Sequence, residues 1–115
     1  MKRKIILNYK GKKFNLELKE MKGVFRKGTG LMFCRRENAK ALLFCFKKPI
    51  ALAFHSFFVF FDFIAIWLDK EDKILEVKKI KPWKADIKLG KKFVKLIEIP
   101  INERYKEIIK LLDDD

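Results

Sequence analysis

The longest apolar stretch of the chain is ALAFHSFFVFFDFIAIWL, residues 51–68, and the way this stretch folds decides the class of the protein. Polar side chains interrupt it only at His55, Ser56 and Asp62, so hydropathy alone would mark it as a transmembrane helix. A carboxylate inside such a helix would cost about 2.5 to 3.5 kcal/mol. The stretch is also rich in Phe, Ile and Val, which is typical of buried strands. We therefore predict two consecutive core strands and no membrane span.

Two segments with strand character precede this stretch. Residues 5–9 and 14–19 lie on either side of Gly11, and the second alternates strictly between apolar and polar side chains. This pattern predicts an opening β-hairpin. Residues 41–46 predict another strand, which Pro49 should end because proline cannot donate a hydrogen bond to a β-ladder.

Further strands follow the stretch. The charged turn at residues 69–73 predicts a hairpin between residues 63–68 and 74–80. Residues 93–99 predict one more strand, again from their apolar and β-branched side chains.

The C-terminal segment has a different period. Residues 103–112 carry apolar side chains at helical spacing, and Asn102 is in position to cap a helix. Residues 113–115 are three aspartates at the unfavourable end of the helix dipole, which predicts a frayed tail. The fold class predicted for residues 1–115 is mainly β: one compact barrel or sandwich of about six strands with a short C-terminal helix.

Composition restricts the environment and the size of the protein. The chain has 115 residues, half of them hydrophobic, which is enough for one domain with one core. Its N-terminus lacks the long apolar segment of a signal peptide, so we expect a cytoplasmic protein. The absence of Gln and the abundance of Lys and Glu resemble thermophile composition. Cys34 and Cys45 are expected to be free thiols, although a thermophile could bridge them.

The net charge of +13 is concentrated in residues 1–48, which hold 15 Lys and Arg against three Glu, a net of +12. Such a field attracts polyanions, so binding of single-stranded nucleic acid or RNA is one hypothesis. The aromatic side chains lie in apolar runs that predict burial, which weighs against base stacking. The candidate phosphate-binding residues are Lys10, Lys12, Lys13, Arg26, Lys27, Arg35 and Arg36.

The sequence offers few groups for catalysis. His55 is the single histidine and Ser56 the single serine, and as neighbours on a predicted strand they would point to opposite faces. Both cysteines have apolar surroundings, which lower thiol reactivity. The sequence also lacks the closely spaced cysteine pair that is typical of a zinc site. Glycines between residues 23 and 30 do not form a phosphate loop, because no strand leads into them. We predict no catalytic residue, metal or cofactor, and a protein that is not an enzyme.

Several short motifs occur in an order that resembles a known family, the domain of unknown function 192 family, over residues 19–99. The motifs are Gly30-Leu31-Met32-Phe33, ALLFCF at residues 41–46, HSFFVFF at residues 55–61, LDKEDK at residues 68–73 and Lys81-Pro82-Trp83. The chain is similar to a short archaeal-type member. The resemblance implies a compact β-rich domain with no established biochemical activity, and archaeal relatives that often lack a signal peptide.

The remaining hypothesis is a non-enzymatic module that binds a small ligand or a protein partner. Its predicted pocket contains His55, Asp62, Arg35 and Trp83. Trp83 follows Pro82, so a turn could hold its ring in solvent as an anchor for a partner, although packing of such a ring onto the core is the commoner outcome. A membrane-associated protein is a further, minor alternative.

Overall fold

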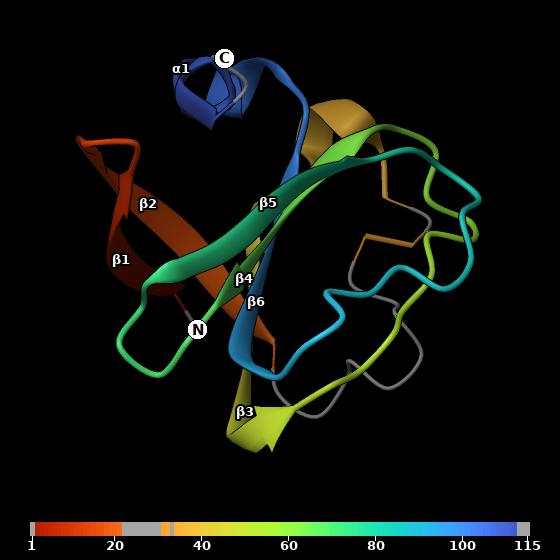
Figure 1. The fold of residues 1–115 in the computed structure, drawn as a ribbon. Coiled ribbons are helices and arrows are strands. Elements are labelled where there is room, and N and C mark those ends of the chain that lie inside the picture. The colour runs from red at the N-terminus through yellow and green to blue at the C-terminus, as the bar shows by residue number, and fades with distance from the viewer. Residues whose placement is uncertain (1, 22–30, 33, 113–115) are drawn as a thin grey trace.

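The computed structural model describes residues 2–21, 31–32 and 34–112, and these form one curled sheet with short helices (Figure 1). The strands are β1 (Lys2–Tyr9), β2 (Lys12–Met21), β3 (Leu42–Ile50), β4 (Phe63–Leu68), β5 (Ile74–Ile80) and β6 (Phe93–Pro100). The helices are η2 (Arg36–Asn38), η3 (Glu103–Tyr105) and α1 (Lys106–Leu112). The strand order is β1-β2-β3-β6-β4-β5, and the edge strands β1 and β5 approach each other, which makes a half-barrel. The predicted mainly β class is confirmed.

The opening hairpin has the predicted alternation. Buried side chains alternate with exposed ones along β1 and β2, and Tyr9 pairs with Lys12 across a two-residue turn. Lys10 and Gly11 in that turn have φ of 51° and 81°. Positive φ at both central residues is typical of a type I′ turn, whose twist matches that of the strands. The β4–β5 hairpin and the last strand β6 are likewise confirmed.

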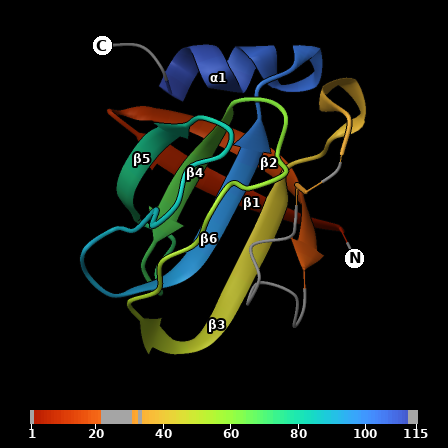
Figure 2. The same cartoon turned by 90° about the vertical axis from the view of Figure 1, so that its right-hand side faces the viewer.

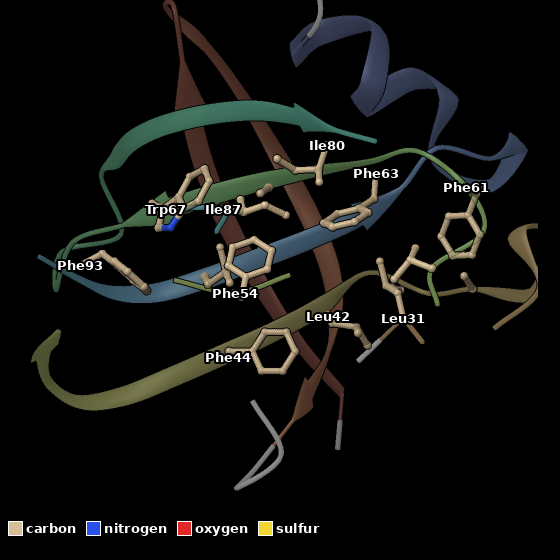
Figure 3. Close-up of a cluster of buried hydrophobic side chains, with 14 residues drawn as sticks. Leu31, Leu42, Phe44, Phe54, Phe61, Phe63, Trp67, Ile80, Ile87 and Phe93 are labelled. Atoms are coloured by element: carbon tan, nitrogen blue, oxygen red, sulfur yellow. The ribbon is translucent and has the colours of Figure 1, made fainter. Parts of the chain in front are cut away.

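Two hydrophobic clusters cover the two faces of the sheet. We call the first the hairpin core, because β1 and β2 pack there against β4, β6 and α1. We call the second the loop core, because segments outside the strands cover it (Figure 3). The buried members of the loop core are Leu31, Ala39, Leu42, Phe44, Phe54, Val59, Phe61, Phe63, Ala65, Trp67, Ile80, Ile87, Phe93 and Leu96. Strand β4 contributes alternate residues to both cores, which explains its uninterrupted apolar sequence.

The prediction of two strands in residues 51–68 is only half right. Phe63–Leu68 is the central strand β4, but residues 51–62 cross the loop core as an irregular segment, on the side of the sheet that Figure 2 turns toward the viewer. Their link to another strand-like segment is an isolated bridge between Phe54 and Ile87. The sheet needs a cover for its second face, and this segment supplies it. No helix in the described part of the chain is long and apolar enough to span a membrane.

Two smaller expectations also need correction. Pro49 does not end its strand: β3 continues to Ile50 through a register irregularity after Cys45, which accommodates the missing N–H. Asn102 does precede a helical segment, but its side chain makes no capping hydrogen bond. Its amide nitrogen instead donates to the carbonyls of Arg36 at 2.7 Å and Ala39 at 3.1 Å, which ties the C-terminal segment to η2. The predicted tail, residues 113–115, lies outside the described residues.

Candidate binding surface

Four aromatic side chains are exposed together, contrary to the expectation that the aromatic runs are buried. Phe57, Phe58, Phe60 and Trp83 have exposed fractions of 37%, 41%, 58% and 51%. Trp83 lies at the centre: its ring centroid is 4.7 Å from that of Phe58, 6.2 Å from Phe57 and 6.1 Å from Phe60. His55 stacks on Phe57 at 4.7 Å. We call these five residues the aromatic surface cluster. Exposed aromatic patches of this kind commonly mark interaction sites.

Two residues of the aromatic surface cluster have an unfavourable backbone conformation. Phe58 has φ of 62°, and it is the third residue of a turn closed by a hydrogen bond from the Val59 N–H to the Ser56 carbonyl at 3.2 Å. Trp83 also has φ of 62°, and it follows Pro82 in a separate turn at residues 82–83. Glycine is favoured at such positions, and a bulky residue there costs about 1 to 3 kcal/mol. The fold therefore tolerates strain at two residues whose rings contact each other at the centre of the aromatic surface cluster.

The buried side chain of Ser56 joins these two turns. Its hydroxyl donates to the Lys81 carbonyl at 2.7 Å and accepts from the Lys84 N–H at 2.8 Å, so it bridges the turn that contains Trp83. The Ser56 backbone adds bonds to the Trp83 N–H at 2.9 Å and the Lys84 carbonyl at 2.8 Å. Ser56 is fully buried. These bonds fix the loop of Phe57, Phe58 and Phe60 against the turn of Trp83.

The charged groups beside the aromatic surface cluster are mainly basic. Lys81 and Lys84 flank Trp83 in the sequence and are exposed. The Lys81 Nζ lies 3.8 Å from the Asp62 Oδ2. His55 is half-buried, and its Nδ1 accepts a hydrogen bond from the Phe57 N–H at 3.2 Å. The surface thus combines aromatic rings with two ammonium groups.

Two of the four residues of the predicted pocket belong to the aromatic surface cluster, and a third lies beside it. His55 and Trp83 both belong to the aromatic surface cluster, whereas Asp62 contacts Lys81 beside it. Arg35 is exposed at the start of η2. A cavity of about 720 Å³ lies between β2, residues 38–42 and the C-terminal helical segment, and none of these four residues lines it.

The predicted phosphate-binding residues also fall into separate groups. Lys10, Lys12 and Lys13 lie at the tip of the β1–β2 hairpin, while Arg35 and Arg36 lie at η2, apart from that tip in Figures 1 and 2. The other two residues of that prediction, Arg26 and Lys27, lie outside the described residues. The outward face of β1 and β2 was not singled out from the sequence, although its alternation was visible. Its exposed charged residues are Lys2, Lys4, Lys13, Glu17 and Lys19.

The side chains considered for catalysis do not form a common site with one another in the structure. His55 and Ser56 lie in a loop, not on a strand, so the reason given for their separation was wrong; their side chains nevertheless bond to different backbone groups. No disulfide joins Cys34 and Cys45, and burial raises the pKa of the Cys45 thiol. Within the described ranges, no group of three or more His, Cys, Asp or Glu side chains could hold a metal ion.

Glu98 is a buried carboxyl that sequence analysis missed. It lies on β6 between Leu42 of β3 and Ala65 of β4, and only 4% of its surface is exposed. Both neighbours belong to the loop core, and strand alternation places Glu98 on that face. Burial raises the pKa of its carboxyl to about 8, so the folded protein keeps it mostly protonated at neutral pH.

Comparison with known proteins places the chain in a family. The model of the DUF192 family, described as "Uncharacterized ACR", matches residues 5–109. The chain belongs to the DUF192 family. The match extends the resemblance found in residues 19–99 to nearly the whole chain. No curated protein matches it significantly.

Two solved structures share the fold of this DUF192 chain. One is a putative transcription regulator from Sinorhizobium meliloti 1021, with a TM-score of 0.74, 15% identity, and coverage of 93% of this chain and 84% of that one. The other is a protein of unknown function from Novosphingobium aromaticivorans DSM 12444, with a TM-score of 0.68, 12% identity, and coverage of 93% and 78%. At these identities the likeness concerns the fold alone.

Proposed function

We propose that this DUF192 protein is a non-enzymatic binding module that docks a protein partner onto the aromatic surface cluster. The observation that carries the proposal is the exposure of Trp83 and three Phe rings on two strained turns that Ser56 holds together. Aromatic residues dominate the binding energy of protein interfaces. Strained residues concentrate at functional sites. Without a functional benefit, glycine would be favoured at these two positions because it adopts positive φ without strain. A small ligand is usually bound in a concave pocket that encloses it, so an open surface of exposed rings suits a protein partner better.

A photo-cross-linking experiment tests this proposal. A photoreactive phenylalanine analogue is placed at Phe60, the most exposed ring of the aromatic surface cluster, and the protein is irradiated in an extract of the source organism. We expect one protein to cross-link specifically, and the Trp83→Ala substitution to abolish that product. The matched control places the analogue at Ile6, an exposed apolar residue of β1. The same products from both positions, or no product at Phe60, would reject the proposal.

Nucleic-acid binding is a second candidate, favoured by the outward face of the β1–β2 hairpin. Lys2 pairs with Lys19 across the two strands, and Lys4 and Lys13 extend the same face, with Glu17 as its acidic residue. A row of lysines can contact phosphates without sequence specificity. The Sinorhizobium neighbour is described as a putative transcription regulator, a role stated of that protein, and it makes a nucleic-acid assay worthwhile here.

Fluorescence anisotropy with labelled single- and double-stranded oligonucleotides tests this second candidate. We expect binding at low salt that weakens steeply as salt increases, and a Lys4→Glu, Lys13→Glu double variant that binds much less. Lys79→Glu on β5 is the matched exposed control. Absence of binding at low salt would exclude the candidate.

A further inference from the structure

The charges beside the aromatic surface cluster indicate the kind of protein that would cover it. Lys84 is exposed, and it has no ion-pair partner among the described residues. Lys81 contacts Asp62, but the two side chains are 68% and 32% exposed, and such pairs contribute roughly 0 to 1 kcal/mol. Both ammonium groups therefore remain accessible, and the chain as a whole carries +13. A partner that covers Trp83 without supplying carboxylates would bring no compensation for these charges.

A second copy of this chain fits the surface poorly. In a two-fold symmetric dimer the same patch lies on both sides of the interface. Lys81 and Lys84 of one copy would then face the lysines of the other, and two bodies of charge +13 would be brought together. Like charges across an interface oppose association.

The geometry of the rings weighs against single-stranded nucleic acid. The rings that surround Trp83 are inclined to it by 42° to 64°, so they engage its ring with edges and tilted faces. A platform for successive bases presents flat faces that stack with each base. The rings around Trp83 do not have this arrangement.

The backbone of the surface weighs against a lipid bilayer. Insertion of aromatic side chains into a fluid interface needs exposed rings but no particular arrangement of them. Here the Ser56 hydroxyl fixes one turn against the other, and Phe58 and Trp83 keep a strained conformation. Such preorganisation increases affinity for a partner of defined shape, because less conformational entropy is lost on binding.

We infer that the aromatic surface cluster binds an acidic segment of a partner protein. An apolar side chain of that segment packs against Trp83 and Phe60, and neighbouring carboxylates pair with Lys81 and Lys84. This inference rests on the proposed function, since it specifies the chemistry of the partner that binds there.

Selection from a library of random peptides displayed on phage tests the inference. Peptides enriched on the wild-type protein should carry net negative charge and at least one aromatic or aliphatic residue. Their affinity should fall at least about tenfold in Trp83→Ser and in a Lys81→Glu, Lys84→Glu double variant. Ile6→Ser and Lys79→Glu, which change exposed residues of β1 and β5, are the matched controls and should bind normally.

Each outcome has a defined meaning. Enriched peptides that are neutral or basic but still depend on Trp83 would overturn this inference and leave the proposed function standing. Enrichment that is absent, or independent of Trp83 and Phe60, would overturn both. Vesicles of phosphatidylglycerol and phosphatidylcholine, and an oligothymidylate, are assayed in parallel; Trp83-dependent binding to either without acidic peptides also overturns the inference. If Trp83→Ser does not fold by circular dichroism, Phe60→Ser, at the more exposed ring, replaces it.

Discussion

The two tryptophans of this protein belong to two aromatic regions with opposite properties. Trp67 lies on β4 within the loop core, is fully buried, and is surrounded by rings such as Phe54, whose centroid is 6.1 Å away. Trp83 lies at the centre of the aromatic surface cluster and is half exposed. The first region occupies regular sheet backbone, whereas the second occupies two turns with positive φ. Burial of Trp67 thus stabilises the fold, whereas at the surface the ring contacts are offset by the strained backbone of Phe58 and Trp83.

The largest expected effect separates the two regions by stability. Trp67→Ala should lower the free energy of unfolding by about 3 to 5 kcal/mol, because it leaves a large cavity in the loop core. Urea denaturation followed by circular dichroism measures the change. Trp67→Phe is the control and should cost much less, since it keeps a ring, and the indole Nε1 that it removes has no hydrogen-bond partner within the described part of the chain. Equal losses in both variants would contradict this account.

The bonds of Ser56 should have the next largest effect. Ser56→Ala leaves the Lys81 carbonyl and the Lys84 N–H without their partner, and a buried unsatisfied polar group costs about 1 to 3 kcal/mol. In the Trp67→Phe background, Trp83 is the single tryptophan, so its fluorescence reports on the surface turn directly. We expect lower stability and increased quenching of Trp83 by acrylamide. Unchanged quenching would show that Ser56 does not hold the turn.

Glu98 should make the stability of the loop core depend on pH. Burial raises its pKa in the fold from the ordinary 4.5 to about 8, so the folded state binds more protons than the unfolded state between these values. The contribution of Glu98 to the free energy of unfolding should therefore be highest below about pH 4.5 and should be lost as pH rises through about 8. Glu98→Gln should remove this dependence and be more stable than wild type at pH 9. Parallel pH profiles of urea midpoints in the two proteins would refute the prediction.

The smallest expected change in stability lies at the surface. Trp83→Ala should alter the free energy of unfolding by only about 1 kcal/mol, because the ring is half exposed and its contacts are with other exposed rings. Phe58→Gly should be near neutral, since release of the strained φ offsets the lost ring contact. Thermal denaturation of both variants measures the changes. Loss of the fold in Trp83→Ala would mean that the two aromatic regions share one structural role.

The strands were predictable where one period dominates the sequence. The alternation of Phe14, Leu16 and Leu18 predicted β2 and its buried face, and the charged turn after Leu68 predicted the β4–β5 hairpin. Residues 51–62 were not predictable in this way, because Phe54 and Phe61 turn into the core while Phe58 and Phe60 turn outward without a regular period.

The binding surface was only partly predictable. Trp83 after Pro82 allowed an exposed ring in a turn, although packing onto the core was the commoner expectation, and His55 was placed in the same predicted pocket. The three Phe rings that join them gave no separate signal, since apolar side chains in a long apolar run predict burial. Ser56 gave no signal either, because its role depends on contact with Lys81 and Lys84, which lie far along the chain. Glu98 likewise gave no signal, because nothing in the sequence of its strand showed that it would be buried between two neighbouring strands.

The sequence by itself determined the mainly β class, the hairpins and the excess of positive charge in residues 1–48. These properties follow from local periodicity and from composition, which need no knowledge of distant contacts. Only the tertiary structure decided which aromatic residues are core and which are surface. The reason is physical: the sheet has two faces to cover, and the segment that covers the second face must turn at Ser56 to meet residues 81–84. That turn directs part of the longest apolar stretch into the solvent, where it forms the aromatic surface cluster.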